Sequence, residues 1–98
     1  MNYALVTGAS GGIGKGIALS LAKAGYNLIL TCRQNTDDLT KVANEASKYN
    51  VIIHTFTGDL GQPNTCEELF SYVNHNNLSI DVLINNAGIS YVGLLQDM

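Results

Sequence analysis

Short apolar runs alternate with longer segments of helical periodicity along this chain, and that alternation restricts its fold more than any other feature. The apolar runs are Tyr3–Val6, Leu28–Cys32, Val51–Phe56 and Val82–Ile84. Short runs rich in Val, Ile and Leu are typical of strands buried on both faces of a parallel sheet. We therefore expect a three-layer α/β fold with helices on both faces of the sheet. Because crossovers are right-handed and sequential strands tend to be neighbours, the expected strand order is 3-2-1-4.

Three helices are predicted between these runs. The first covers about Ile13–Ala24 and is closed by Gly25, since glycine favours the conformation that follows a helix end. The second begins at Asn35 or Thr36, either of which can cap it. The third begins at Pro63, because proline suits the first helical turn. Their apolar faces consist, in chain order, of Ile13, Ile17 and Leu21; of Leu39, Val42, Ala43 and Ala46; and of Cys66, Leu69, Phe70 and Val73.

Composition and charge exclude several functions. The chain has 98 residues, enough for one small domain, and its net charge is −3 with no run of Lys or Arg. Nucleic acids and anionic membrane surfaces are therefore not expected partners. The apolar stretches are too short and interrupted for a membrane span or a signal peptide. Cys32 and Cys66 lack the spacing of a metal or redox site, so we expect reduced thiols in a cytoplasmic protein.

The glycine-rich stretch Thr7–Gly14 lies directly between the first apolar run and the first helix. Glycine permits a sharp backbone turn there and lets a ligand approach the main chain closely. The first amide groups of a helix have no partner within it and carry partial positive charge, so they attract phosphate. The stretch therefore predicts a dinucleotide site in the crevice at the carboxyl ends of strands 1 and 4.

Other kinds of glycine-rich loop fit this stretch less well. A Walker A loop needs glycine at the position of Ala9 and a magnesium-binding hydroxyl at the position of Gly16. The Gly-x-Gly-x-x-Gly fingerprint would need a small residue in place of Ile17. The pattern present is Gly-x-x-x-Gly-x-Gly, formed by Gly8, Gly12 and Gly14. For the loop taken alone, a strand-to-helix turn without a ligand is the alternative interpretation.

The combination of Thr-Gly-x-x-x-Gly-x-Gly with Asn85-Asn86-Ala87-Gly88 resembles the short-chain dehydrogenase/reductase superfamily. The resemblance covers the whole chain in the expected order and spacing. It implies a Rossmann-type fold and an oxidoreductase that transfers hydride between a nicotinamide cofactor and a carbonyl compound. The opening Ala-Leu-Val-Thr-Gly-Ala-Ser is most similar to the 3-oxoacyl-[acyl-carrier-protein] reductases of fatty acid biosynthesis. Reductases that act on the ketone of a modified elongation factor P are the alternative branch.

The resemblance also implies which residues bind the cofactor. The loop wraps the pyrophosphate and the adenosine ribose through Gly8, Ser10, Gly11, Gly12, Ile13 and Gly14. The cofactor's ribose side is lined by residues after the fourth strand, namely Asn86, Ala87 and Gly88. Thr7 and Asn85 are expected instead to be structural, joining strands 1 and 4 through hydrogen bonds.

Asp59 and Leu60 follow the third apolar run. In the family, the corresponding acidic residue accepts a hydrogen bond from the adenine amino group, and the next residue packs beside the ring. On its spacing alone, Asp59 is a turn-forming aspartate ahead of Gly61. With the other motifs present, adenine contact is the favoured interpretation.

The end of the second strand indicates which nicotinamide cofactor is used. An Asp or Glu at this position binds the ribose hydroxyls of NAD and repels a 2′-phosphate. Here Cys32 occupies the acidic position and Arg33, whose guanidinium can pair with phosphate, follows it. We therefore expect NADP(H) rather than NAD(H). Gly11 stands where many NADPH-dependent relatives carry Arg or Lys, so Arg33 is the one evident residue that could bind the 2′-phosphate. The alternative interpretation of Arg33 is a solvated loop residue without a ligand.

The family's catalytic Tyr-x-x-x-Lys pair is absent, because none of the five tyrosines has lysine four residues later. We expect the catalytic positions beyond Met98, so residues 1–98 would be the N-terminal dinucleotide-binding part of a single domain that lacks its catalytic half. The parent enzyme would reduce a ketone, such as a 3-oxoacyl thioester or another small-molecule or carrier-bound carbonyl substrate, and would form a homo-oligomer. The alternative is a non-catalytic nucleotide-binding or dimer-forming product.

The fourth apolar run generates a prediction about association. An apolar strand at an uncovered sheet edge pairs readily with another strand. The 98-residue chain is therefore expected to dimerise, or to be only marginally stable, when produced alone. Light scattering and thermal melting test this, and a monodisperse monomer with a cooperative melt at high temperature would contradict it.

Overall fold

Four strands and three α-helices alternate in the computed structural model, which describes residues 3–86. In chain order the elements are β1 (Tyr3–Thr7), α1 (Gly12–Lys23), β2 (Asn27–Cys32), α2 (Thr36–Ala46), the short 3-10 helix η1 (Ser47–Tyr49), β3 (Ile53–Thr57), α3 (Pro63–His75) and β4 (Ile80–Asn85). The predicted alternation is confirmed. The third strand begins at Ile53 rather than Val51, and the fourth is longer than its apolar run.

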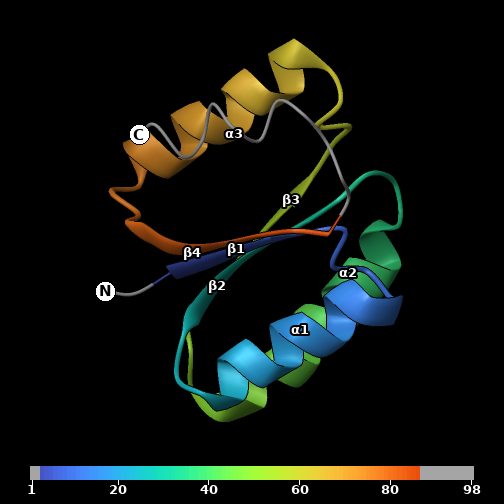
Figure 1. Cartoon of the computed structure of the whole chain (residues 1–98), viewed down its shortest axis with the longest axis vertical. Coiled ribbons are helices and arrows are strands. Elements are labelled where there is room, and N and C mark those ends of the chain that lie inside the picture. The colour runs from blue at the N-terminus through green and yellow to red at the C-terminus, as the bar shows by residue number, and fades with distance from the viewer. Residues whose placement is uncertain (1–2, 87–98) are drawn as a thin grey trace.

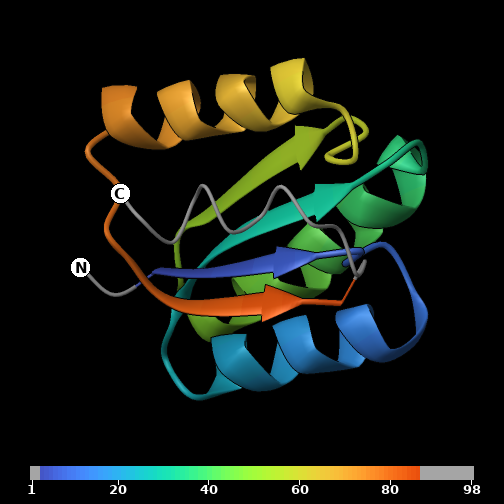
Figure 2. The same cartoon turned by 45° about the horizontal axis from the view of Figure 1, so that its top comes forward.

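All four strands are parallel and lie in the order β3-β2-β1-β4, which confirms the predicted topology. Figure 2 shows their arrows pointing the same way, so their carboxyl ends meet at one edge of the sheet. Every residue of β1 is buried, because this strand has a neighbour on each side and helices on each face. Leu5, at its centre, is in register with Ile29 of β2 and Leu83 of β4.

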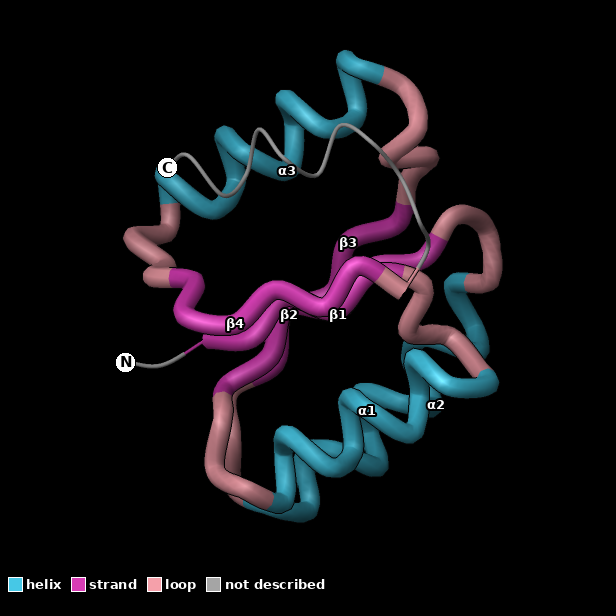
Figure 3. Tube along the Cα trace, viewed as in Figure 1, coloured by secondary structure: helices cyan, strands magenta, loops and turns pink. Residues whose placement is uncertain are grey.

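The helices form two layers, with α1 and α2 on one face of the sheet and α3 on the other (Figures 1 and 3). Alternate strand residues supply the two cores. Ala4, Val6, Leu28 and Leu30 belong to the core under α1 and α2. The core under α3 contains Tyr3, Leu5, Ile29, Leu69 and Val73. The sheet is thus buried on both faces, as its near-continuous apolar strands require.

Helix α1 does not bury the face that its large apolar residues indicated. Ile13 is 75% exposed, and Ile17 and Leu21 are half-buried. The buried residues of α1 are instead Gly14, Ala18 and Ala22. Small side chains let the helix backbone approach the strands closely, so the larger side chains flank the contact. The spacing correctly predicted a helix, but the stripe formed by Ile13, Ile17 and Leu21 is not the face that the helix buries.

The other two helices bury the side chains expected of them. Leu39, Val42 and Ala46 are buried on α2, with Ala43 half-buried. On α3 the buried residues are Cys66, Leu69 and Val73, and Phe70 packs half-buried against the same core. Burial, and secondarily the negative charge of Glu67, raises the pKa of the Cys66 thiol. Within residues 3–86, no helix combines the length and apolar character needed to cross a membrane.

The small-residue face of α1 leads to a stability prediction. Ala18→Leu should lower the free energy of unfolding by about 1–3 kcal/mol, because the added side chain has no room between helix and sheet. Ser20→Leu adds a similar side chain at an exposed position of the same helix and should change it by less than about 0.5 kcal/mol. Urea denaturation measures both values, and equal losses would show that α1 is not seated on this face.

Candidate cofactor-binding site

The loop between β1 and α1 has backbone conformations that glycine adopts without strain. Gly8 has a φ of +64° and Gly12 a φ of +58°, both in the left-handed region. Between them, Ala9 is buried and its N–H donates to the carbonyl oxygen of Thr31 at 2.9 Å. The loop is therefore anchored to β2 while it turns the chain from the end of β1 into α1.

Gly14 is the point where the first turn of α1 touches this loop. A Cβ atom at Gly14 would overlap the carbonyl oxygen of Gly8 and would lie 2.8 Å from Nδ2 of Asn86. That amide nitrogen donates to the same Gly8 oxygen at 3.1 Å, which ties the loop to the residue following β4. A hydrogen atom is thus the only side chain that fits at Gly14.

The outer side of the loop is open, in contrast to the packing at Gly14. A Cβ atom at Gly11 or Gly12 would meet nothing within 4 Å. Gly11 is the N-cap of α1 and provides no capping side chain, so the first amides of the helix have no side-chain acceptor from it. These amides and the positive end of the helix dipole can bind an anionic group. The loop therefore fits a cofactor diphosphate.

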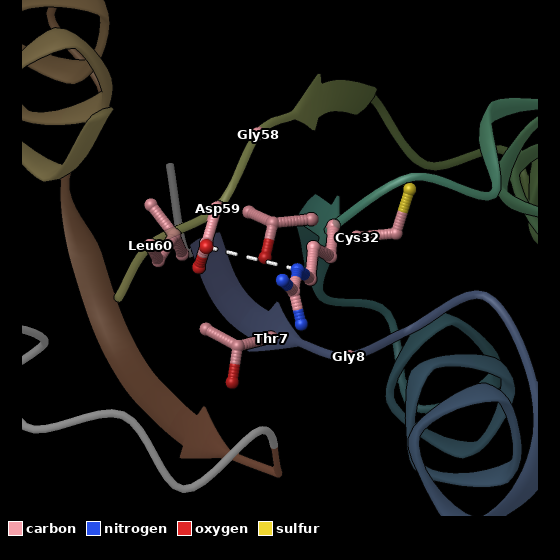
Figure 4. A pocket seen from close by; sticks show the side chains of 8 residues that line it. Thr7, Gly8, Cys32, Gly58, Asp59 and Leu60 are labelled. Carbon is pink, nitrogen blue, oxygen red and sulfur yellow. Dashed lines mark ion pairs between the residues drawn. The ribbon is translucent and has the colours of Figure 1, made fainter. Parts of the chain in front are cut away.

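A cavity of about 190 Å³ lies beside the loop at the carboxyl ends of β1, β2 and β3. Its lining residues are Thr7, Gly8, Thr31, Cys32, Arg33, Gly58, Asp59 and Leu60. Figure 4 shows Asp59 and Leu60 on one side of this pocket and Gly8 and Cys32 on the other. The structure therefore brings Gly8, Arg33, Asp59 and Leu60, four of the residues predicted from sequence, into one pocket.

A second hollow of about 340 Å³ adjoins the first and shares Gly8, Cys32 and Arg33 with it. Ser10 lines this hollow, together with Gln34 and Asn35 from the segment before α2. Gln34 and Asn35 were not predicted as site residues. Their position directly after the end of β2 was the signal that could have identified them, because parallel sheets bind ligands at strand ends.

The predicted crevice lay between the ends of strands 1 and 4, whereas these two hollows lie on the β2 and β3 side of β1. Toward β4, side-chain hydrogen bonds join the strand ends. The hydroxyl of Thr7 is 3.4 Å from the carbonyl oxygen of Ile84 and 3.3 Å from Oδ1 of Asn85. This confirms the structural role predicted for Thr7 and Asn85. Ala87 and Gly88 lie outside the described residues.

Asp59 makes two contacts at the mouth of the pocket. Its Oδ1 accepts the N–H of Gly61 at 2.9 Å, which is the turn-forming role that its spacing indicated. Its Oδ2 lies 3.6 Å from Nε of Arg33, and the dashed line in Figure 4 marks this ion pair. The side chain of Arg33 is 72% exposed and that of Asp59 37% exposed. Arg33 is thus a loop residue at the surface that already has a carboxylate partner.

Cys32 ends β2 with a buried side chain. It packs in the core under α1 and α2, and its Sγ lies 3.8 Å from the hydroxyl of Thr57. Thr36 donates from its hydroxyl to the same oxygen of Thr57 at 3.4 Å. The position that would carry a carboxylate in an NAD-binding site is therefore occupied by a thiol held between β2, β3 and α2.

The sheet order, the glycine loop and the pocket at the strand ends define the class of Rossmann-type nucleotide-binding domains. Within that class, the sequence model of the short chain dehydrogenase family matches residues 2–98. This chain belongs to the short-chain dehydrogenase/reductase family, as its motifs indicated.

Relatives with curated descriptions include two oxoacyl reductases. The 3-oxoacyl-[acyl-carrier-protein] reductase FabG of Staphylococcus epidermidis is 38% identical over 95 residues, which cover 97% of this chain and 39% of that protein. The very-long-chain 3-oxoacyl-CoA reductase of Coccidioides immitis is 40% identical, and the match covers 92% of this chain and 26% of that protein. The chain therefore spans well under half the length of these relatives.

Solved structures show the same fold. L-sorbose reductase from Gluconobacter frateurii, crystallised with NADPH and L-sorbose, superposes with a TM-score of 0.81 at 33% identity. That match covers 88% of this chain and 33% of the reductase. YwfH, an NADPH dependent reductase involved in bacilysin biosynthesis, has a TM-score of 0.80 at 33% identity, with 87% of this chain and 34% of YwfH covered.

Two neighbouring glycines of α1 provide a matched test of the loop packing. Gly14→Ala should lower the free energy of unfolding by about 1–3 kcal/mol, because its methyl group overlaps the Gly8 backbone. Gly16→Ala should raise it by about 0.5–1 kcal/mol, since nothing lies within 4 Å and alanine favours the helix. Urea denaturation of both variants checks the prediction, and a tolerated Gly14→Ala would contradict the close contact.

Proposed function

We propose that this chain is the NADPH-binding part of a short-chain reductase that transfers hydride to a ketone. The observation that carries the proposal is an open glycine loop next to a pocket that contains Arg33 and no carboxylate at the end of β2. Residues 1–98 would then be the N-terminal dinucleotide-binding portion of one Rossmann-type domain.

The diphosphate would lie against the loop and the first turn of α1. Gly12, Ile13 and Gly14 begin this helix, and their amides have no acceptor within it. Gly8 and Ser10 border the hollow next to the loop, on the path toward the adenosine. The exposed side chain of Ile13 would cover the cofactor on the solvent side. Gly11 would leave the approach to the loop open, because no side chain occupies its outer face.

The adenosine would lie in the pocket between the ends of β2 and β3. Leu60 is buried and lines this pocket, so it offers an apolar surface to the adenine ring. Asp59 would accept from the adenine amino group, and Arg33 would bind the 2′-phosphate of NADPH through charge-assisted hydrogen bonds. Because Cys32 stands in place of a carboxylate, the end of β2 would not repel that phosphate. The NADPH named for L-sorbose reductase and for YwfH supports this choice of cofactor.

The substrate would be a ketone, with a 3-oxoacyl thioester as the first candidate. FabG of Staphylococcus epidermidis and the oxoacyl-CoA reductase of Coccidioides immitis support this substrate class by their names. The bound cofactor supplies the hydride. The glycine loop and the pocket would bind and orient its diphosphate and adenosine, and Asn86, Ala87 and Gly88 would line its ribose side. The proton donor would come from a part of the protein beyond these residues.

Reversing the charge of Arg33 tests the proposed cofactor. Arg33→Asp should weaken NADPH binding by at least about tenfold and NADH binding by far less, because a carboxylate repels only the 2′-phosphate. Lys48→Asp makes the same charge change in η1, which precedes β3 and so lies away from the carboxyl ends of the strands, and should alter neither affinity appreciably. Fluorescence titration with each cofactor measures the dissociation constants. Equal losses for NADPH and NADH in Arg33→Asp would refute the assignment of NADPH.

A further inference from the structure

We infer that Asp59 tunes the choice between NADPH and NADH, because it competes with the 2′-phosphate for Arg33. This inference rests on the proposed function, and it gives Asp59 a role in addition to adenine contact. The evidence is the ion pair between Nε of Arg33 and Oδ2 of Asp59, which joins two residues proposed to bind different parts of the same cofactor.

The ion pair spans two strand ends at the mouth of the pocket. Arg33 follows β2 and Asp59 follows β3, and both residues line the cavity of about 190 Å³. Figure 4 shows the pair drawn across this pocket. In the free protein, the guanidinium that would receive the 2′-phosphate is therefore already engaged by a carboxylate within the same site.

The two partners are not held equally. Asp59 is anchored by the N–H of Gly61 at 2.9 Å, a hydrogen bond that fixes its carboxylate within the turn. Arg33 is 72% exposed, and its one ion pair among residues 3–86 is the 3.6 Å contact with Asp59. A separation of 3.6 Å exceeds a good hydrogen bond, and exposed pairs of this kind are weak. Arg33 is thus the partner that can move to a new anion.

The competition follows from comparing the partner of Arg33 in the NADPH complex with its partner in the NADH complex. NADPH brings a 2′-phosphate that would draw the guanidinium of Arg33 toward itself, so binding would give up the 3.6 Å contact between Nε of Arg33 and Asp59. NADH has no such group, and Arg33 can keep its partner. Asp59 therefore lowers the affinity for NADPH without lowering the affinity for NADH. The preference that Arg33 creates is moderated by the carboxylate beside it.

The charge of Asp59 can be removed while its turn is kept. In Asp59→Asn the side-chain carbonyl can still accept from Gly61 and from an adenine amino group, but it no longer pairs with a guanidinium. Asp59→Ser is a second uncharged variant whose hydroxyl can also accept from Gly61. Circular dichroism and urea denaturation show whether each variant is folded. Arg33→Gln, alone and combined with Asp59→Asn, completes a double-mutant cycle.

Dissociation constants for NADPH and NADH are measured by fluorescence titration for each variant. Asp59→Asn should bind NADPH about two- to fivefold more tightly, the gain expected from releasing one exposed ion pair, and NADH no more tightly. Asp59→Ser should shift the ratio of the two constants in the same direction. In the Arg33→Gln background, Asp59→Asn should leave the ratio unchanged, because no guanidinium remains to be released.

Three results would overturn the inference. One is an unchanged or weaker affinity for NADPH in Asp59→Asn, and another is an equal gain for both cofactors. The third is a shift of the ratio that persists in the Arg33→Gln background, which would indicate a general field of the carboxylate rather than competition for Arg33. If the unsubstituted chain binds neither cofactor, the proposed function itself fails, and this outcome is distinct from all three.

Discussion

The close seating of α1 on the sheet is the constraint on which the rest of the site depends. Gly14, Ala18 and Ala22 form the buried face of this helix, and Gly14 lies directly against the backbone of Gly8. Because the helix comes this close, its first turn lies against the loop that follows β1. The positive end of its dipole and its unpaired amides are therefore brought to the same edge of the sheet as the pocket. A larger residue at Gly14 would separate the two.

The site is held together by hydrogen bonds rather than by buried charge. Thr7 binds the end of β4, the N–H of Ala9 binds Thr31 of β2, and Asn86 reaches back to Gly8. The charged residues Arg33 and Asp59 are at the surface of the pocket, where an ion pair contributes little to folding. The framework is thus linked by hydrogen bonds, while Arg33 is exposed and in contact with a single carboxylate at 3.6 Å. Such an arrangement suits an anionic ligand that must bind and leave.

The sequence was a reliable guide wherever one local pattern had a single physical solution. Apolar runs separated by helical segments have few arrangements other than a parallel sheet with right-handed crossovers, so the strand order was predicted correctly. The positive φ of Gly25 after α1, +98°, was likewise implied by its position. The buried face of α1 was predicted wrongly, because the prediction relied on hydrophobicity, and isoleucine is more hydrophobic than alanine. The contact between α1 and the sheet is determined instead by how closely the helix backbone approaches the strands, which favours small side chains.

Asp59 shows most clearly where sequence reasoning ends. The residue types and their order indicated a parallel sheet, a glycine-rich turn at Thr7–Gly14 and a cation after β2, because each of these can be inferred from patterns along the chain. That Arg33 and Asp59 form an ion pair was decided only by the tertiary structure. The two residues are far apart along the chain, and the parallel register of β2 and β3 brings their strand ends together. Contacts between side chains from different strands depend on that register and on packing, which no local pattern specifies.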